Sequence, residues 1–332
     1  MRTVLAAALA AVIVTPALAD PVELKFAFGG PPQAALYSQG IQPWSEQVSK
    51  DSDGTIDIKL FPGGTIANLN QAYDRVLNGV ADFSYVLTGL YAQQFPRTMV
   101  AMLPFETRNP REGGLALWRL YEKGVFDKEL SSIKPVAAFV FTNQSLHSLK
   151  SITTIADMKG TKVSTQSRIL GGVIERLGGA PITMPPTDLY QALQRGTIDA
   201  AGIGWPGVIP FKLYEVTSFH IDTPLAAETG LNIMNKDAYA RLPAKSKAAI
   251  DKLAGLPFTD MMVKAIAQME NQGRKFTKAQ PNQTISQIPA DEEARWKARA
   301  EPVTEEWVKA TPDGAQVLAA YRAEIAAIRA GK

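Results

Sequence analysis

The sequence predicts an α/β protein of two similar lobes, and three observations lead to this fold class. Residues 159–222 carry strand, turn and helix signals in unbroken βαβαβ order. Part of that pattern occurs a second time, at a constant separation of 117 positions. The chain has 332 residues and no cysteine. Its stability must therefore come from cores of domain size rather than from disulfides, and its length favours about two domains.

The N-terminal segment 1–19 has the pattern of a cleavable secretory signal. Arg2 provides a basic start, Val4–Val14 is apolar, and Ala17-Leu18-Ala19 is the small-x-small pattern that precedes a cut before Asp20. The apolar run is shorter than the roughly 20 residues that a membrane-spanning helix needs. We therefore expect an exported, periplasmic protein without membrane insertion once the signal is removed.

The first lobe should span residues 20–142. Alternation at Val22–Phe28 and Ile56–Phe61 predicts two strands, each ended by a glycine- and proline-rich turn. Helical spacing follows each strand, at 36–48 and 71–78, and a third strand is expected at 80–86. In such units ligands bind at the carboxyl ends of the strands.

The second lobe should span residues 143–229. A strand at Lys162–Thr165 precedes Ser167, a good N-cap for a helix over 169–177, which Gly178 can end. The next strand, helix and strand follow at 181–184, 188–195 and 198–203.

The repeat joins a helix, a glycine stop, an aspartate and an apolar strand. Its two copies are Tyr73, Val76, Gly79, Asp82 and Tyr190, Leu193, Gly196, Asp199. Any αβ unit needs a helix-ending glycine, so the matches could be coincidence, but the shared offset favours a genuine repeat. The cleft between two such lobes is the expected ligand site.

The remaining chain should complete both lobes with helices. A strand at 231–234 and a helix at 236–253 precede a regular apolar stripe over 258–276, which is long enough to lie across both lobes. Helices are expected from Asp291 to the end. We assign residues 230–269 to lobe I and 270–332 to lobe II.

Catalytic and metal-binding motifs are missing from the sequence. His147 and His220 are the only histidines and lack the paired spacing of a metal site. No GxSxG, HExxH, P-loop or GxGxxG motif occurs. With 35 basic and 32 acidic residues and no basic run, nothing suggests nucleic acid. An exported hydrolase would have to assemble scattered Ser, His and Asp residues, so we expect neither an enzyme nor a cofactor.

Short motifs along nearly the whole mature chain resemble the DctP-type solute receptors of tripartite ATP-independent periplasmic (TRAP) transporters. They are 155–163 (IADMKGTKV), 189–199, Phe61-Pro62-Gly63-Gly64 and Leu103-Pro104-Phe105. The resemblance implies a two-lobe periplasmic-binding-protein fold with crossing strands and a long helix spanning both lobes. It also implies a receptor, expected to be a monomer, that binds a small organic anion and delivers it to a sodium-coupled TRAP permease. A receptor that presents its ligand to a sensor domain would have the same fold.

This sequence departs from the family at the usual anchor of the ligand. Members usually carry an arginine where this chain has Ser164, and that arginine pairs with the substrate carboxylate. Arg168 resembles the second arginine of one subgroup, and Gly204-Trp205-Pro206 replaces a Gln-Glu-Asn turn of many relatives. The indole removes donors and adds apolar area, so we expect a monocarboxylate with an apolar or aromatic body.

The candidate ligand-binding residues lie at or just after expected strand ends. They are Arg168, Trp205, Ser164, Gln144, His147, Phe28, Gly30, Tyr85, Tyr91 and Met184. Arg168 is expected to anchor the anion through its planar guanidinium group, which can hold a carboxylate with two parallel hydrogen bonds, beside the N–H groups at the helix start. The alternative partner of Arg168 is a protein carboxylate, in which case Ser164, Gln144 and His147 could bind an uncharged ligand. For Trp205 the alternative is core packing.

Overall fold

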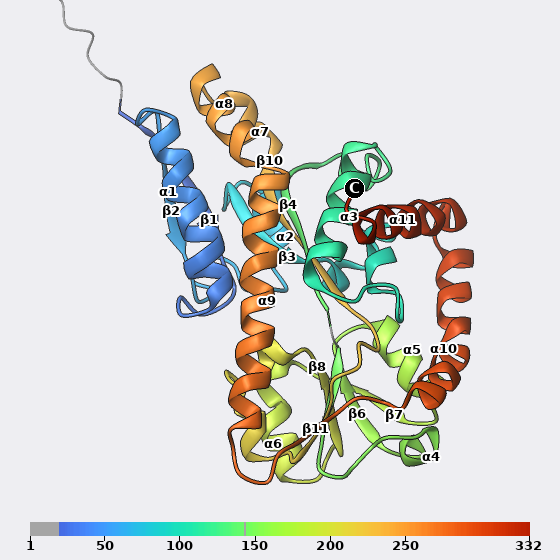
Figure 1. Cartoon of the computed structure of the whole chain (residues 1–332). Coiled ribbons are helices and arrows are strands. Elements are labelled where there is room, and N and C mark those ends of the chain that lie inside the picture. The colour runs from blue at the N-terminus through green and yellow to red at the C-terminus, as the bar shows by residue number, and fades with distance from the viewer. Residues whose placement is uncertain (1–19, 143) are drawn as a thin grey trace, which may run out of the picture.

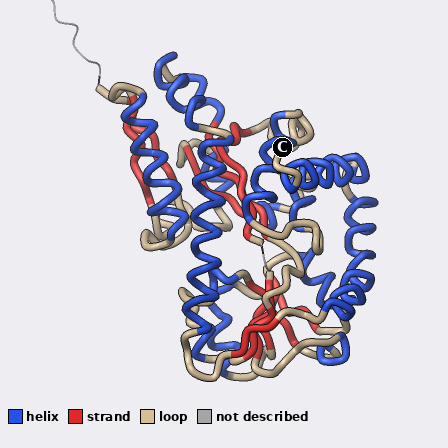
Figure 2. Tube along the Cα trace, in the orientation of Figure 1, coloured by secondary structure: helices blue, strands red, loops and turns tan. Residues whose placement is uncertain are grey.

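The computed structural model describes residues 20–142 and 144–332, so the predicted signal segment 1–19 lies outside the described residues. Strands gather into two separate sheets, one in each lobe, with helices around them (Figures 1 and 2). The predicted two-lobe α/β fold is confirmed.

The sheet of lobe I has five strands in the order β2-β1-β3-β10-β4. Their bounds are β1 Val22–Ala27, β2 Ile56–Phe61, β3 Phe83–Leu87, β4 Ile133–Phe141 and β10 Glu228–Asn235. β1 is parallel to β2 and β3, whereas β10 is antiparallel to both β3 and β4. The carboxyl ends of β1, β3 and β4 therefore all point to the edge at which β10 enters the lobe.

The sheet of lobe II has six strands in the order β11-β9-β5-β8-β6-β7. Their bounds are β5 Ser145–Ser148, β6 Lys162–Thr165, β7 Ala180–Thr183, β8 Ala200–Ile203, β9 Phe219–Ile221 and β11 Thr284–Ser286. β6 is parallel to β8, and Ile203 at the end of β8 pairs with Ser145 at the start of β5. The carboxyl ends of β6 and β8 thus lie where the chain enters lobe II.

Helices cover both sheets. They are α1 Gln42–Asp51, α2 Ala72–Leu77, α3 Pro110–Glu122, α4 Ile155–Met158, α5 Arg168–Arg176, α6 Leu189–Gln194, α7 Lys236–Arg241, α8 Ala244–Leu253, α9 Leu256–Lys278, α10 Ala290–Ala310 and α11 Gly314–Arg329. Short turns of helix add η1 Leu36–Ile41, η2 Thr88–Tyr91, η3 Thr98–Met102, η4 Pro186–Asp188, η5 Trp205–Gly207 and η6 Leu213–Glu215. Over the described ranges, no helix combines the length and apolar character required to cross a membrane.

Several segments join the lobes, and three of them lie along the junction. The chain crosses from β4 to β5 and returns from β9 to β10, and the backbone N–H of Gln144 in the first crossing donates to the carbonyl of Ala226 in the second. The third segment is α9, which runs along both lobes in Figure 1. It contacts α3 and β4 in lobe I and η5 in lobe II. Gly273 permits this approach, because a Cβ there would lie 2.5 Å from the carbonyl oxygen of Trp205.

The C-terminal helices divide between the lobes. α10 contacts α5 of lobe II, as expected, but α11 packs against α3 of lobe I (Figure 1). Tyr321 of α11 is fully buried, and its hydroxyl lies 2.6 Å from that of Thr107. Arg329 also pairs with the buried Glu112 of α3. Assigning all of 270–332 to lobe II was therefore wrong for α11. Its apolar face packs on α3, and Arg329 near its C-terminal end pairs with Glu112 of that helix.

Candidate functional site

The junction between the lobes, where five strand ends meet the crossing segments, gathers most of the expected ligand-binding residues. Phe28 directly follows β1, whereas Tyr85 is the middle residue of β3. From the other lobe, Ser164 lies near the end of β6, and Arg168 begins the helix that follows. In both lobes the carboxyl ends of the strands thus face the crossing segments.

The lobe I side of the junction is aromatic. The ring of Phe28 lies 5.7 Å from that of Tyr37 and 5.3 Å, edge-on, from that of Tyr85. Tyr85 stacks on Phe139 at 5.1 Å, and Phe139 meets Phe141 edge-on at 5.9 Å. We call these five rings the aromatic cluster. Its geometry is the offset and edge-to-face packing that aromatic rings prefer. Phe28, Tyr85 and Phe139 are buried in the core of lobe I, and Tyr37 and Phe141 pack against it.

The lobe II side is polar, and many of its polar atoms have no partner. Ser164 is fully buried, yet its hydroxyl makes no hydrogen bond within 20–142 and 144–332. The same holds for the side-chain oxygen of Gln144, the hydroxyl of Ser145 and both amide atoms of Gln166. Buried polar groups are normally satisfied, since each unmade bond costs about 1 to 3 kcal/mol. This cluster therefore has the polar character of a binding surface.

Arg168 is exposed at the first position of α5. Ser167 caps this helix as predicted, its side chain accepting from the backbone N–H of Leu170. No ion pair or hydrogen bond of the Arg168 side chain occurs in the described part of the chain. The protein carboxylate weighed as its alternative partner is thus not found there. Arg168 as an anchor for an anion stays a prediction.

His147 is fully buried in β5, and both of its ring nitrogens have partners. Nδ1 lies 2.8 Å from Nδ1 of His220, and Nε2 lies 3.2 Å from the carbonyl oxygen of Ile203. Burial lowers the pKa of His147 well below its usual range, with repulsion from His220 as a second cause. His147 therefore supports the lobe II sheet, and its hydrogen-bonding capacity is already used.

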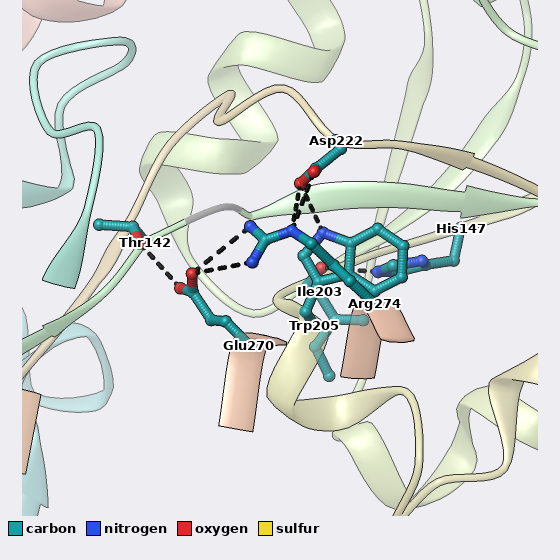
Figure 3. Close-up of polar contacts among 7 residues, drawn as sticks. All are labelled: Thr142, His147, Ile203, Trp205, Asp222, Glu270 and Arg274. Carbon is teal, nitrogen blue, oxygen red and sulfur yellow. Dashed lines mark hydrogen bonds and ion pairs between the residues drawn. The ribbon is translucent and has the colours of Figure 1, made fainter. Parts of the chain in front are cut away.

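Trp205 is also fully buried, in the core of lobe II. Its ring meets His147 edge-on at 4.9 Å, and the guanidinium of Arg274 lies 5.6 Å above it (Figure 3). Its indole N–H donates to Asp222 at 2.7 Å. These contacts agree with the alternative interpretation, in which Trp205 packs in the core. Contact between Trp205 and a ligand stays a prediction.

A charged network fastens α9 to the crossing segments (Figure 3). Arg274 Nε donates to both oxygens of Asp222 at 2.9 Å, and its terminal nitrogens lie 3.4 and 3.5 Å from Glu270. Thr142, which directly follows β4 in the first crossing segment, donates to Glu270 at 2.7 Å. Burial raises the pKa of Glu270 to about 7, although Thr142 and Arg274 act in the opposite direction. This network lies beside the two crossing segments, which we call the hinge. It was not predicted from sequence, because its members are far apart in the chain.

The other three expected residues take different places. Gly30 lies under the ring of Phe28, because a Cβ there would be 2.8 Å from Phe28 Cζ. Tyr91 belongs to the core of lobe I, and its hydroxyl donates to the carbonyl of Leu69. Met184 follows β7 and packs against the core of lobe II. Their contact with a ligand stays a prediction.

Two residues of β10 that were not predicted also belong to the junction. Glu228 and Asn232 are buried, and both amide atoms of Asn232 have no partner among the described residues. Asn232 interrupts the apolar run from Leu231 to Met234, which is the signal that could have identified it. Among the described residues, no group of three or more His, Asp or Glu side chains could hold a metal ion.

Comparisons with known proteins agree with this arrangement. Residues 30–310 match the model of the DctP family, bacterial extracellular solute-binding protein family 7. The chain is 27% identical over 316 residues to the outer membrane transporter protein TsaT of Comamonas testosteroni, covering 90% of each chain.

Two solved structures are similar in both sequence and fold. One is a TRAP solute-binding protein of Rhodoferax ferrireducens in complex with copurified benzoate, at 32% identity and a TM-score of 0.85, covering 92% of this chain and 98% of that one. The other is a marine metagenome TRAP solute-binding protein specific for aromatic acid ligands, in complex with metahydroxyphenylacetate. It has 28% identity and a TM-score of 0.86, and the match covers 92% and 98% of the two chains.

Proposed function

Because the chain belongs to the DctP family of bacterial extracellular solute-binding proteins, we propose that it is a receptor for an aromatic monocarboxylate bound at the junction between its lobes. Proteins of this family bind solutes and are not enzymes, which confirms the prediction that the chain is a receptor rather than a hydrolase. We further propose that it works in the periplasm and delivers its ligand to a sodium-coupled TRAP membrane permease.

The aromatic cluster is the observation that carries the choice of ligand. Its rings come from the end of β1, from η1, β3 and β4, and they pack against one another at centroid distances of 5.1 to 5.9 Å. A dicarboxylate or sugar acid would leave its polar groups unpaired against such a surface, at a cost of about 1 to 3 kcal/mol each. An aromatic ring instead gains buried apolar area there. The ligands named for the two solved relatives, benzoate and metahydroxyphenylacetate, support this choice.

The carboxylate of the ligand should then lie toward lobe II. The unpaired Ser164 and Gln166 offer hydrogen bonds there, and the exposed N–H groups at the start of α5 favour negative charge. Arg168 adds the only full positive charge that the β6–α5 connection supplies. An anion binding here would gain from all three features.

A panel of organic acids tests the proposed function by thermal shift and calorimetry. Benzoate, 3-hydroxybenzoate and mandelate should raise the melting temperature, since a ligand at 100 times its Kd adds about 2.7 kcal/mol to the free energy of unfolding. Succinate and galacturonate serve as polar controls and should have little effect. Stabilisation by these two acids, with none by the aromatic acids, would contradict the proposed ligand class.

Replacing Arg168 tests the anchor. Arg168→Ala should weaken benzoate binding about 10- to 100-fold, or about 1.4 to 2.8 kcal/mol. Arg168→Lys should lie in between, because an ammonium cannot hold a carboxylate with two parallel bonds. The free protein should lose no stability, since a cation at a helix start is disfavoured by a few tenths to about 1 kcal/mol.

Arg176→Ala is the matched control for this prediction. Arg176 ends the same helix and pairs with Glu306 on the surface, where both side chains are about half exposed. Its removal should leave affinity unchanged. Equal affinity of the wild type and Arg168→Ala for benzoate would show that hydrogen bonds alone hold the carboxylate.

A further inference from the structure

Glu228, Asn232 and Tyr85 place polar groups on a single face of the lobe I sheet. Side chains alternate along a strand, so Glu228 and Asn232 of β10 point to the same side. Tyr85 of β3 is the direct cross-strand neighbour of Asn232. All three residues are buried, with exposed fractions of 8%, 0% and 5%. Polar groups in this position need an explanation, because the same face carries the aromatic cluster.

The rings of the aromatic cluster surround these polar groups. Gly230 lies between Glu228 and Asn232 on β10, and a Cβ there would be 2.2 Å from the ring of Phe139. The absence of a side chain at Gly230 thus lets Phe139 cross β10 and stack on Tyr85. Phe28 closes the other side of Tyr85 at 5.3 Å. The polar groups therefore lie within apolar walls and close to the position proposed for the ligand ring.

The hydrogen bonds of this group are incomplete. Both amide atoms of Asn232 lack a partner among residues 20–142 and 144–332, although it could donate two bonds and accept two. Glu228 accepts from the backbone N–H of Gly89 at 3.2 Å, and no ion pair of Glu228 occurs in the described part of the chain. An unpaired buried amide in a folded protein points to a ligand or to a bound water.

The protonation of Glu228 suits an anionic ligand. Burial raises the pKa of the Glu228 carboxyl to about 8, against hydrogen bonds from Gly89 and Thr229 that lower it. At neutral pH the group is then mainly an uncharged acid, which can both donate and accept a hydrogen bond. An ionised carboxylate in the same place would repel the bound anion.

We propose that Asn232, beside Tyr85, is a recognition point for a hydroxyl group on the aromatic body of the ligand. A hydroxyl both donates and accepts, so it can bond to either atom of the Asn232 amide. Glu228 lies four positions away along β10, beyond the ring of Phe139 over Gly230, and its uncharged acid form only avoids repelling the anion. The preferred ligands are then hydroxylated aryl carboxylic acids, with their carboxylate toward Ser164 and Arg168. This inference rests on the proposed function and narrows its ligand class.

Calorimetry with benzoate, 3-hydroxybenzoate and 4-hydroxybenzoate tests the recognition point. The wild type should bind one of the two hydroxybenzoates at least about 10-fold more tightly than benzoate, because a site built to bond a hydroxyl rejects the analogue that lacks it. Asn232→Leu should bring this ratio close to one, while its affinity for benzoate changes less than about threefold. Tyr85→Phe removes only a hydroxyl and keeps the ring stacked on Phe139. It should also lower the affinity ratio, and it provides the test if Asn232→Leu fails to fold.

Thr229→Val is the matched control. Thr229 is the next residue along β10, is equally buried and points to the other face, where it bonds with Thr88. Its replacement should leave the ratio unchanged. Equal wild-type affinities for all three acids would overturn the recognition point and leave the proposed function standing, as would a ratio that Tyr85→Phe and Asn232→Leu both retain. If no aromatic acid binds the wild type, both proposals fall.

Discussion

Trp205→Ala should lower the free energy of unfolding by about 3 to 5 kcal/mol, which is the usual cost of emptying a large aromatic site in a core. Trp205 has no exposed surface and touches His147, His220 and Arg274. Its removal would also take away the N–H that binds Asp222 at 2.7 Å. Urea unfolding, with the slope checked for two-state behaviour, measures this loss.

Trp205→Phe separates the core role of this residue from a role in ligand binding. Phenylalanine keeps most of the packing and loses the bond to Asp222, so the expected loss of stability is about 1 to 3 kcal/mol. A fall of about tenfold or more in benzoate affinity would place the indole against the ligand. Unchanged affinity would make Trp205 a core residue only and remove it from the site.

Trp296→Phe is the control for both tryptophan variants. Trp296 is equally buried, and its N–H also donates to a carboxylate, that of Glu292 at 3.3 Å. It lies in α10, away from the strand ends of the junction (Figure 1). Its replacement should lower stability without changing affinity. An equal fall in affinity in both Phe variants would trace the effect to general loosening of the fold.

Arg274→Ala should lower the free energy of unfolding by about 2 to 4 kcal/mol. Removing one partner of a largely buried ion pair leaves the other charge without compensation, and here two carboxylates lose the same cation. The side chains of Asp222 and Glu270 are only 20% and 6% exposed, so water can replace Arg274 only in part. The network also joins α9 to both crossing segments, and the loss should therefore loosen the hinge.

The loss in Arg274→Ala should depend on pH. The pKa of Glu270 is about 7 with Arg274 present, and removing the cation raises it further above the unfolded value. The native variant then binds a proton that the unfolded chain releases, so its stability falls as pH rises through that pKa. Urea unfolding should show a smaller difference from the wild type at pH 5 than at pH 8.

Lys264→Ala provides the comparison on the same helix. Lys264 pairs with Asp260 one turn away, and its side chain is 75% exposed. Exposed pairs of this kind contribute about 0 to 1 kcal/mol, so the variant should unfold almost as the wild type does. A similarly small effect for Arg274→Ala would mean that the network does not hold α9 to the hinge.

The sequence by itself determined the α/β class, the two lobes and the residues at the strand ends. These features depend on local signals: alternation in β1, the Ser167 cap of α5, and the apolar stripe of α9. The order and spacing of short motifs also identified the family, which the match over residues 30–310 confirmed. Such signals need only neighbours within a few residues, so a single sequence carries them in full.

Only the tertiary structure decided which side chains face one another across the junction. Asp222 and Arg274 are 52 positions apart, and Asn232 meets Tyr85 only through the register of β10 with β3. The packing of α11 on lobe I likewise depends on contacts with Thr107 and Glu112, more than 200 positions away. Contacts of this range follow from how packed layers bring distant segments together, and no local pattern encodes them. The same packing encloses Trp205 and pairs His147 with His220, although as isolated residues both looked free to reach a ligand.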